Sequence, residues 1–282
     1  MSTISAAAVK TLRDRTNLPM MDCKSALTEA KGDMEKAVEI LRTRFKGVQD
    51  KRQGRETGEG RIAAFVDPGQ QVGALVDVRC ESAPVAKSEP FVQLANDIAR
   101  QVALKSPATV EQLLAQPFVG DPKKTVNDRV AEVVGMIREN MRPARFTRFT
   151  GEVGYYCHHD GSVGAMVQVE GGKADPQMLK EVCMHIVFKN PLAARREDVP
   201  ADLVAKETEI AKKQIAADPK NQNKPANILD KITEGKMNAW FAENVLVDQP
   251  FVKDDTKTVG ALLKSAGLKL VRFVRYKVGE VS

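Results

Sequence analysis

Apolar residues recur at helical spacing through the first 45 positions of the chain. The recurrence is interrupted at Asn17-Leu18-Pro19 and at Gly32-Asp33, which are residues that end one helix and begin the next. Asp22 is placed to cap the second helix, because an aspartate side chain accepts hydrogen bonds from free backbone N–H groups. We therefore expect a three-helix module over residues 1–45.

The following segment, residues 46–60, has no apolar period. Its sequence, KGVQDKRQGRETGEG, is dense in charge and in glycine. Such a composition offers little apolar surface for packing and is typical of a flexible tether. We expect a charged linker here that lets the helical module move independently.

From residue 61 the apolar period changes to two. The runs IAAFV and VGALVDVRC flank a turn at Asp67-Pro68-Gly69 and predict a β-hairpin, and a helix is expected over residues 89–104. The same unit follows later, as a hairpin with its turn near Asp160-Gly161 and a helix over residues 176–188. Because GALVDV aligns with GAMVQV, and because the two helices end in Lys-Ser-Pro and Lys-Asn-Pro, we infer a degenerate internal duplication.

Between the two units, apolar residues from Val126 to Met141 predict another helix, which leads into an alternating segment over residues 145–153. Beyond Pro200, residues 201–216 and 226–245 read as two helices separated by the polar run DPKNQNKP. Their apolar content is too thin for a core, so a projecting antiparallel hairpin is expected. A short helix over residues 259–263 and a strand over residues 268–278 should return to the second unit.

These patterns predict an α+β fold. The expected parts are a three-helix module (1–45), a flexible charged linker (46–60), the N-terminal core subdomain (61–154), the C-terminal core subdomain (155–200), a helical-hairpin insertion (201–247) and a segment returning to the core (248–282).

Composition narrows the class of protein. Hydrophobic residues make up 43% of the chain and aromatic residues 5%, and the net charge is +6 with basic residues scattered among 37 acidic ones. No apolar run approaches the roughly 20 residues needed to cross a bilayer. The start of the chain becomes charged before a signal-peptide core could form, so we expect a cytoplasmic protein with reduced cysteines.

The sequence offers little that could carry catalysis. Phosphate-binding glycine loops, nucleophile elbows and paired cysteine motifs are absent from it. Cys157, His158, His159 and Asp160 could form a metal site, but consecutive strand residues point to opposite faces, so a polar hairpin tip is the better interpretation. His185 reads as a partly buried helix residue. We therefore expect a binding protein without a cofactor, rather than an enzyme.

Nucleic-acid binding is an alternative, because basic and aromatic residues interleave in RPARFTRF (142–149) and RFVRYK (272–277). The same alternation is typical of any half-exposed strand with aromatic residues inward and charges in water. We favour the strand interpretation.

Several longer stretches resemble one family across nearly the whole chain. LRDRTNLPMMDCKSALTEAKGDMEKAVEILR (12–42) is similar to the ubiquitin-associated-like module of the elongation factor Ts family. ALVDVRCES, LANDIARQVA, MHIVFKNP, NKPANILDKITEGKM, QPFVKDDTKTVGALL and VRFVRYKVGE follow in that family's order.

This resemblance implies a two-part core with a helical-hairpin insertion, and a nucleotide exchange factor that makes and breaks no covalent bond. Its partner would be elongation factor Tu, in GDP-bound and nucleotide-free forms, with no membrane or direct nucleic-acid contact. The factor would disturb the magnesium and nucleotide site of Tu and promote GDP release, so exchanger and nucleotide would weaken each other's binding reciprocally.

The resemblance also assigns contact residues. Arg13, Met20, Met21 and Lys24 match contacts from the helical module to the nucleotide-binding domain of Tu, and Met184 with His185 matches the helix that touches its distal part. From the residues alone, the two methionines could equally belong to the core of the module.

One motif departs from the family. Where the family has Thr-Asp-Phe-Val, a magnesium-dislocation loop, this chain has Ser82, Ala83, Pro84 and Val85. Ala83 carries no carboxylate, and Pro84 should confine Ala83 to extended backbone angles. Either Pro84 and Val85 form a smaller apolar wedge, or the protein is a stabilising partner of Tu with weak exchange. RNA binding is a third hypothesis.

Overall fold

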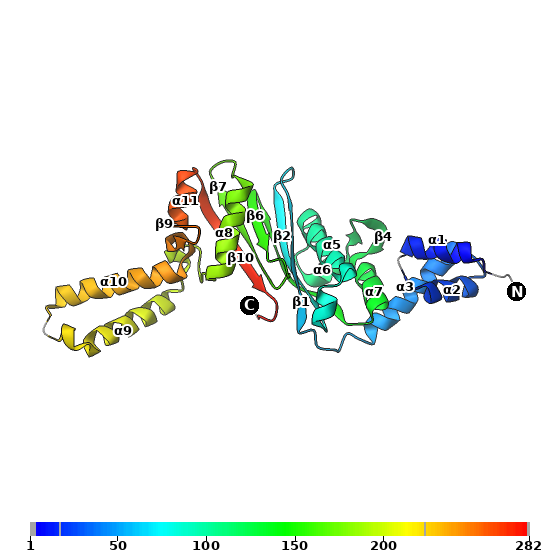
Figure 1. Ribbon diagram of the computed structural model, residues 1–282, viewed down its shortest axis with the longest axis horizontal. Helices are drawn as coiled ribbons and strands as arrows, with labels where there is room; N and C mark the ends of the chain where they lie inside the picture. Colours follow the sequence, from blue (N-terminus) through cyan, green and yellow to red (C-terminus); the bar gives the residue numbers. More distant parts are fainter. Residues whose placement is uncertain (1–3, 17, 223, 281–282) are drawn as a thin grey trace.

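A computed structural model describes residues 4–16, 18–222 and 224–280. The three-helix unit lies at one end of an elongated molecule, two sheets with their covering helices form the centre, and a pair of helices projects at the other end (Figure 1). The mixed helices and antiparallel strands are those of an α+β fold.

The N-terminal unit consists of α1 (Ala6–Thr16), α2 (Met20–Glu29) and α3 (Met34–Asp50). The Asp33 carboxylate caps α3 by accepting from the N–H groups of Glu35 and Lys36, at 3.0 and 3.1 Å. Asp22 does not cap α2, because this helix already begins at Met20 after Pro19 and places Asp22 within its first turn.

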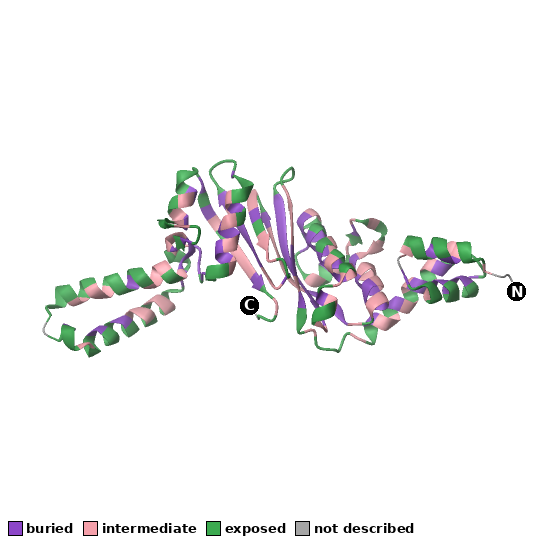
Figure 2. Cartoon of the chain, in the orientation of Figure 1, coloured by how far each residue is buried: buried purple, intermediate pink, exposed green. Residues whose placement is uncertain are grey.

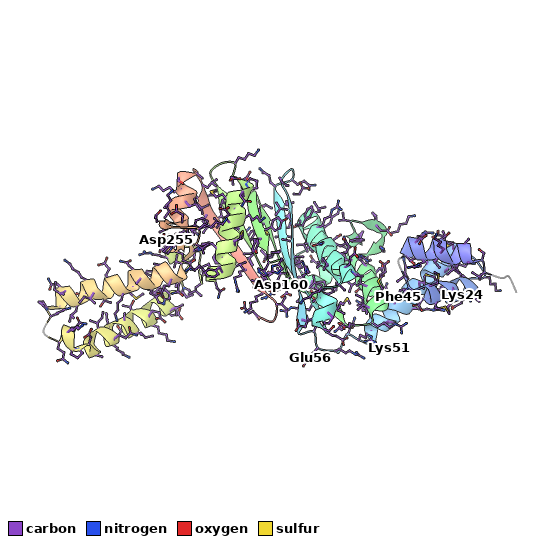
Figure 3. All side chains as sticks on the ribbon, viewed as in Figure 1. Lys24, Phe45, Lys51, Glu56, Asp160 and Asp255 are labelled. Carbon is purple, nitrogen blue, oxygen red and sulfur yellow. The ribbon has the colours of Figure 1, made fainter. Side chains whose placement is uncertain are left out.

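Helix α3 continues through residues 46–50, which were expected to belong to an unpacked linker. That part of the prediction is wrong because these residues have a packing partner, α7 (Val126–Ile137). Phe45, labelled in Figure 3, packs over Gly135 of α7. Gln49 is buried and its amide nitrogen donates to the side-chain oxygen of Asn127 at 3.0 Å. The three-helix unit is therefore seated on the rest of the molecule through α3.

The first sheet contains β1 (Glu59–Asp67), β2 (Val72–Cys80) and β5 (Met141–Thr150) in the order β1-β2-β5, all antiparallel. Met141 begins β5 and is buried in the core, whereas the apolar pattern had placed it on the preceding helix. The helices of this half are α4 (Ala83–Ala86), α5 (Glu89–Lys105), α6 (Val110–Ala115) and α7, with the small hairpin of β3 (Pro117–Phe118) and β4 (Asp121–Thr125) between the last two.

The second sheet contains β6 (Glu152–Cys157), β7 (Val163–Glu170) and β10 (Lys269–Lys277) in the order β10-β7-β6. Its covering helices are α8 (Pro176–Lys189) and α11 (Val259–Ser265), and β8 (Pro250–Phe251) pairs with β9 (Asp254–Thr258). The two sheets meet through an apolar cluster of Ile62, Leu75, Phe149, Met166 and Tyr276.

The two halves repeat each other in detail. Gln116-Pro117-Phe118-Val119 and Gln249-Pro250-Phe251-Val252 each run through a small hairpin into a helix, a repeat that the hairpin and helix patterns had not revealed. At the interface, Arg145 lies 4.4 Å from the ring centre of Tyr276, and Arg272 lies 4.4 Å from that of Phe149. These reciprocal contacts join the halves across the sheet interface.

The projecting arm consists of α9 (Ala201–Ala217) and α10 (Ala226–Asn244), which pack on each other. Most of the arm's surface is exposed or intermediate in Figure 2. At its base, Arg196 donates to Asp248 at 2.6 Å and to Asn238 at 2.9 Å, and it lies over the ring of Phe241. The arm is therefore anchored by a specific set of contacts. Within the described ranges, no helix is long and apolar enough to span a bilayer.

Candidate functional site

The proposed contacts of the three-helix unit lie on its surface. Met20 and Met21 have exposed fractions of 45% and 70%, and Arg13 and Lys24 are also exposed. Helix α2 turns the face that carries Cys23 and Ala26 toward the core of the unit, so that Met21 points away from it and Met20 stands at the exposed first position of the helix. The methionines are therefore not core residues, which resolves the alternative that the sequence left open. A shallow hollow of about 430 Å³ lies beside Met21 and Lys24, near the end of the molecule (Figure 3).

The loop at residues 82–85 folds differently from the expectation. Ala83 is the first residue of α4 and Pro84 occupies the first turn, so Ala83 is helical rather than extended. Proline is tolerated there, because the N–H groups of the first turn have no partner within the helix. Ala83 and Pro84 are exposed, whereas Val85 is half-buried against the core of the first half.

Ser82 is held from one side by a carboxylate. Its N–H donates to Glu139 Oε2 at 3.1 Å and its hydroxyl donates to Glu139 Oε1 at 2.7 Å. The hydroxyl makes no capping bond to α4, although Ser82 is the residue that precedes the helix. Glu139 lies between α7 and β5, so the loop is fixed by a distant part of the chain that the sequence pattern did not point to.

On α8, Met184 is half-buried and His185 is fully buried. The His185 Nδ1 accepts from the N–H of Val252 at 3.2 Å, so Nε2 carries the proton and donates to Gln249 Oε1 at 2.8 Å. Burial lowers the pKa of His185, an effect that the Gln249 bond opposes and the nearby Lys189 charge reinforces. A side chain in this position supports a surface instead of touching a partner.

Gln101 has the same role in the first half. Its amide nitrogen donates to Gln116 Oε1 at 3.0 Å, and its amide oxygen accepts from the N–H of Val119 at 2.8 Å. His185 and Gln101 each lie five residues before the Ser-Pro or Asn-Pro that ends their helix. The position thus anchors the small hairpin that follows in each half.

The exposed apolar residues near His185 were not identified from the sequence. Phe188 is 71% exposed and Leu192 is 52% exposed. Met184 and Phe188 lie one helical turn apart on α8 and therefore share a face. Their spacing of four residues was the available signal, but the family motif drew attention to the neighbouring histidine.

The arginines that raised the nucleic-acid hypothesis are engaged within the protein. Arg145 bonds Asp77 at 3.1 Å, and Arg148 donates to the carbonyl oxygen of Ala103 at 2.8 Å. Arg272 donates to Gln168 at 2.7 Å and Arg275 bonds Glu280 at 3.0 Å. These interactions favour the strand interpretation of both segments.

Groups suited to covalent or metal chemistry are not assembled in the part of the chain that the structure describes. No cluster of three or more histidine, cysteine, aspartate or glutamate residues there has the geometry to hold a metal ion. His158 instead bonds Asp160 at 2.9 Å. Burial raises the pKa of the Cys80 and Cys157 thiols to about 12, which keeps them protonated at neutral pH.

The sequence-assigned residues fall into three separate groups: exposed residues of α1 and α2, the loop at residues 82–85, and the half-buried Met184 with the buried His185 on α8. They are distributed along the long axis and do not converge on one cleft (Figure 1). A cavity of about 900 Å³ lies elsewhere, between β6, the start of α8 and the β1–β2 turn. Such an arrangement suits recognition of a large partner at several points better than binding of a small substrate.

Comparison with known proteins gives a consistent result. The family model described as "Elongation factor TS" matches residues 81–280. An elongation factor Ts of Methylococcus capsulatus is 42% identical over 279 residues, covering 98% of this chain and 92% of the relative. That of a Janthinobacterium species is 43% identical over 282 residues (99% and 92%), and that of Clostridium perfringens is 39% identical over 289 residues (98% and 93%).

Proposed function

This chain belongs to the elongation factor Ts family of translation elongation factors, and on that premise we propose that it binds elongation factor Tu and accelerates the release of its GDP. Both the GDP-bound and the nucleotide-free forms of Tu would be partners. The action is that of a guanine nucleotide exchange factor, which needs no cofactor and carries out no covalent catalysis.

The observation that carries this proposal is the exposure of Met20 and Met21 on α2, together with the exposed cations Arg13 on α1 and Lys24 on α2. Two large apolar side chains on the surface of a small helical unit cost solvation free energy, which contact with a partner would recover. Methionine adapts to the shape of a partner, and the two cations would supply charge complementarity around it. We assign these four residues to the contact with the nucleotide-binding domain of Tu.

We propose that residues 82–85 act at the magnesium and nucleotide site of Tu. Ala83 and Pro84 present a small, rigid, exposed surface at the start of α4. Since the loop has no carboxylate at position 83, it would act by shape and not by competing for the metal. Met184 and the neighbouring Phe188 would hold a second part of Tu, with His185 beneath them. Exchange then follows from reciprocal coupling, typically 1–3 kcal/mol in allosteric systems.

A second function is favoured by the same loop. Val85 is half-buried against the first half's core and Pro84 replaces the family's phenylalanine, so the wedge is much smaller. A factor that binds Tu through α2 and α8 without an effective wedge would stabilise Tu and exchange nucleotide only weakly. Affinity and catalysis of release are separable, because only differential binding of the two nucleotide states promotes release.

We further propose a cytoplasmic location and no direct nucleic-acid contact. The domain boundaries at residues 60, 154, 200 and 247 remain part of the proposal, whereas the three-helix unit now ends with α3 at Asp50. The ubiquitin-associated-like character of that unit is also part of the proposal. The repeated Gln-Pro-Phe-Val hairpins and the reciprocal arginine contacts support an internal duplication of the core.

The test is release of a fluorescent GDP analogue from elongation factor Tu of the same organism at several magnesium concentrations. Acceleration by orders of magnitude at substoichiometric factor is the expected result. Binding without acceleration would favour the stabilising partner, and absence of binding would refute both functions.

A further inference from the structure

Two loops of the first half hold each other beyond the end of the sheet. Cys80 and Met141 are the last register partners of β2 and β5. Just past them, Ser82 donates twice to the Glu139 carboxylate, and the N–H of Asn140 donates to Glu81 Oε1 at 2.6 Å. Adjacent residues on each side thus exchange side-chain bonds. We call these four residues, Glu81, Ser82, Glu139 and Asn140, the clasp.

The clasp also reaches the segment that joins α3 to β1. The side-chain nitrogen of Asn140 donates to the carbonyl oxygen of Arg55 at 2.7 Å and to that of Gln53 at 3.4 Å. Arg55 bonds Glu81 Oε2 at 3.3 Å, and Arg52 lies 4.0 Å from Glu81 Oε1. The connector of the three-helix unit is therefore bonded to Glu81 and Asn140, which are the sequence neighbours of the bonded pair Ser82 and Glu139.

The electrostatics keep the clasp intact at neutral pH. Asn140 is 3% exposed, so loss of its side-chain bonds would leave a buried polar group without a partner. Partial burial of Glu81 raises its pKa, but the Asn140 N–H and the Arg55 and Arg52 cations outweigh that effect and lower it overall. Glu81 therefore stays ionised and its bonds are charge-assisted.

We propose that Glu139 is a positioning residue for the loop at residues 82–85, and that the clasp couples this loop to the connector of the three-helix unit. Glu139 fixes Ser82, the residue directly before α4, and Asn140 fixes the connector that follows α3. The two surfaces assigned to Tu are then held at one mutual orientation, so a partner gripping α2 meets the loop already in place. The role of the clasp in presenting the loop to Tu rests on the proposed function.

Hydrogen exchange of the free protein tests the clasp without Tu. Glu139→Gln should raise exchange of the amides in residues 80–88 roughly tenfold, since bonds to charged groups are the strong ones. Asn140→Ala should raise exchange both in residues 51–58 and in residues 80–88. Glu132→Gln is the matched control, because Glu132 is a part-buried carboxylate of α7 paired with Lys124 and not with the loop. If the amides of residues 80–88 exchange as slowly in Asn140→Ala as in the unmodified protein, the coupling between the connector and the loop is overturned.

Nucleotide release tests whether the clasp positions the loop for function. We expect Glu139→Gln to lower the maximal rate of GDP release roughly tenfold while the half-saturating concentration and the unfolding midpoint match those of Glu132→Gln. A loosened loop with an unchanged maximal rate would refute the positioning role. If the unmodified protein does not accelerate release, the proposed function fails, whereas the hydrogen-exchange experiment still decides whether the clasp couples the loop to the connector.

Discussion

Substitution of Gly135 by alanine tests how the three-helix unit is attached. A methyl carbon at this position would lie 2.7 Å from Cε1 of Phe45 and closer still to Cδ1 and Cγ of the same ring. All three atoms belong to one side chain, which is only 5% exposed and cannot move aside freely. The added methyl group must therefore displace the ring and, with it, α3.

Two opposing effects set the magnitude. Overpacking of a well-filled interface costs about 1–3 kcal/mol. Alanine within a helix is favoured over glycine by about 1 kcal/mol. We therefore expect Gly135→Ala to destabilise the protein by up to about 2 kcal/mol. When Phe45 is first replaced by alanine, the ring is gone and only the helical preference remains, so the same substitution should stabilise by about 1 kcal/mol.

Urea unfolding of the four proteins of this double-mutant cycle, followed by far-UV circular dichroism, measures the reversal of sign. Hydrogen exchange of α3 provides a local readout, because unfolding of a chain with several units need not be two-state. The attachment through Phe45 is refuted if Gly135→Ala stabilises the protein to the same extent in both backgrounds. In that case the contact between Phe45 and Gly135 would not hold the three-helix unit against α7.

Three further outcomes are expected. Ala83→Asp with Pro84→Phe restores the family's wedge and should accelerate GDP release severalfold if the present loop is a weakened wedge; slower release would instead indicate a loop matched to its own Tu. Met21→Ala should weaken binding to Tu about tenfold with an unchanged unfolding midpoint, as measured by calorimetry, and unaltered affinity would remove Met21 from the interface. His185→Gln should remove part of the loss of stability between pH 7.5 and pH 5.5, measured by urea unfolding; identical pH slopes in the two proteins would show that protonation of His185 does not destabilise the fold.

The sequence predicted those elements whose determinants are local. The β1–β2 hairpin was correctly placed because apolar residues recur with a period of two along its strands. In addition, Asp67 accepts from the N–H groups of Gly69 and Gln70 within its own turn. The strands β3 and β8 have only two residues each and show no period. The end of α3 depends on a surface of α7 far away in the sequence, and a local composition rule therefore assigned residues 46–50 to a linker.

The candidate contact residues also divide into those that local sequence predicts and those that depend on distant parts of the chain. Exposure of Met21 follows from its place on the helical face opposite to Cys23, which a periodic pattern contains, whereas Met20 is exposed at the first position of α2. The hold of Glu139 on Ser82 joins positions that are 57 residues apart, and no periodicity encodes it. Position 185 was misread as partly buried because the hairpin that covers it, residues 250–258, comes much later in the chain.

The comparison of His185 with Gln101 separates what the fold requires from what the histidine adds. Both side chains accept from a valine N–H and donate to a glutamine oxygen, so anchoring the hairpin requires only a neutral side chain with one donor and one acceptor. Imidazole can also bind a second proton, and that proton would face the N–H of Val252 in place of a lone pair. Because the folded-state pKa is lowered below the ordinary value of 6.5, the unfolded chain binds the proton first. Stability is therefore complete above pH 6.5 and decreases as the pH falls through the lower folded-state value. An amide at this position has no such dependence, so the second half of the core should be the half that loosens first in acid.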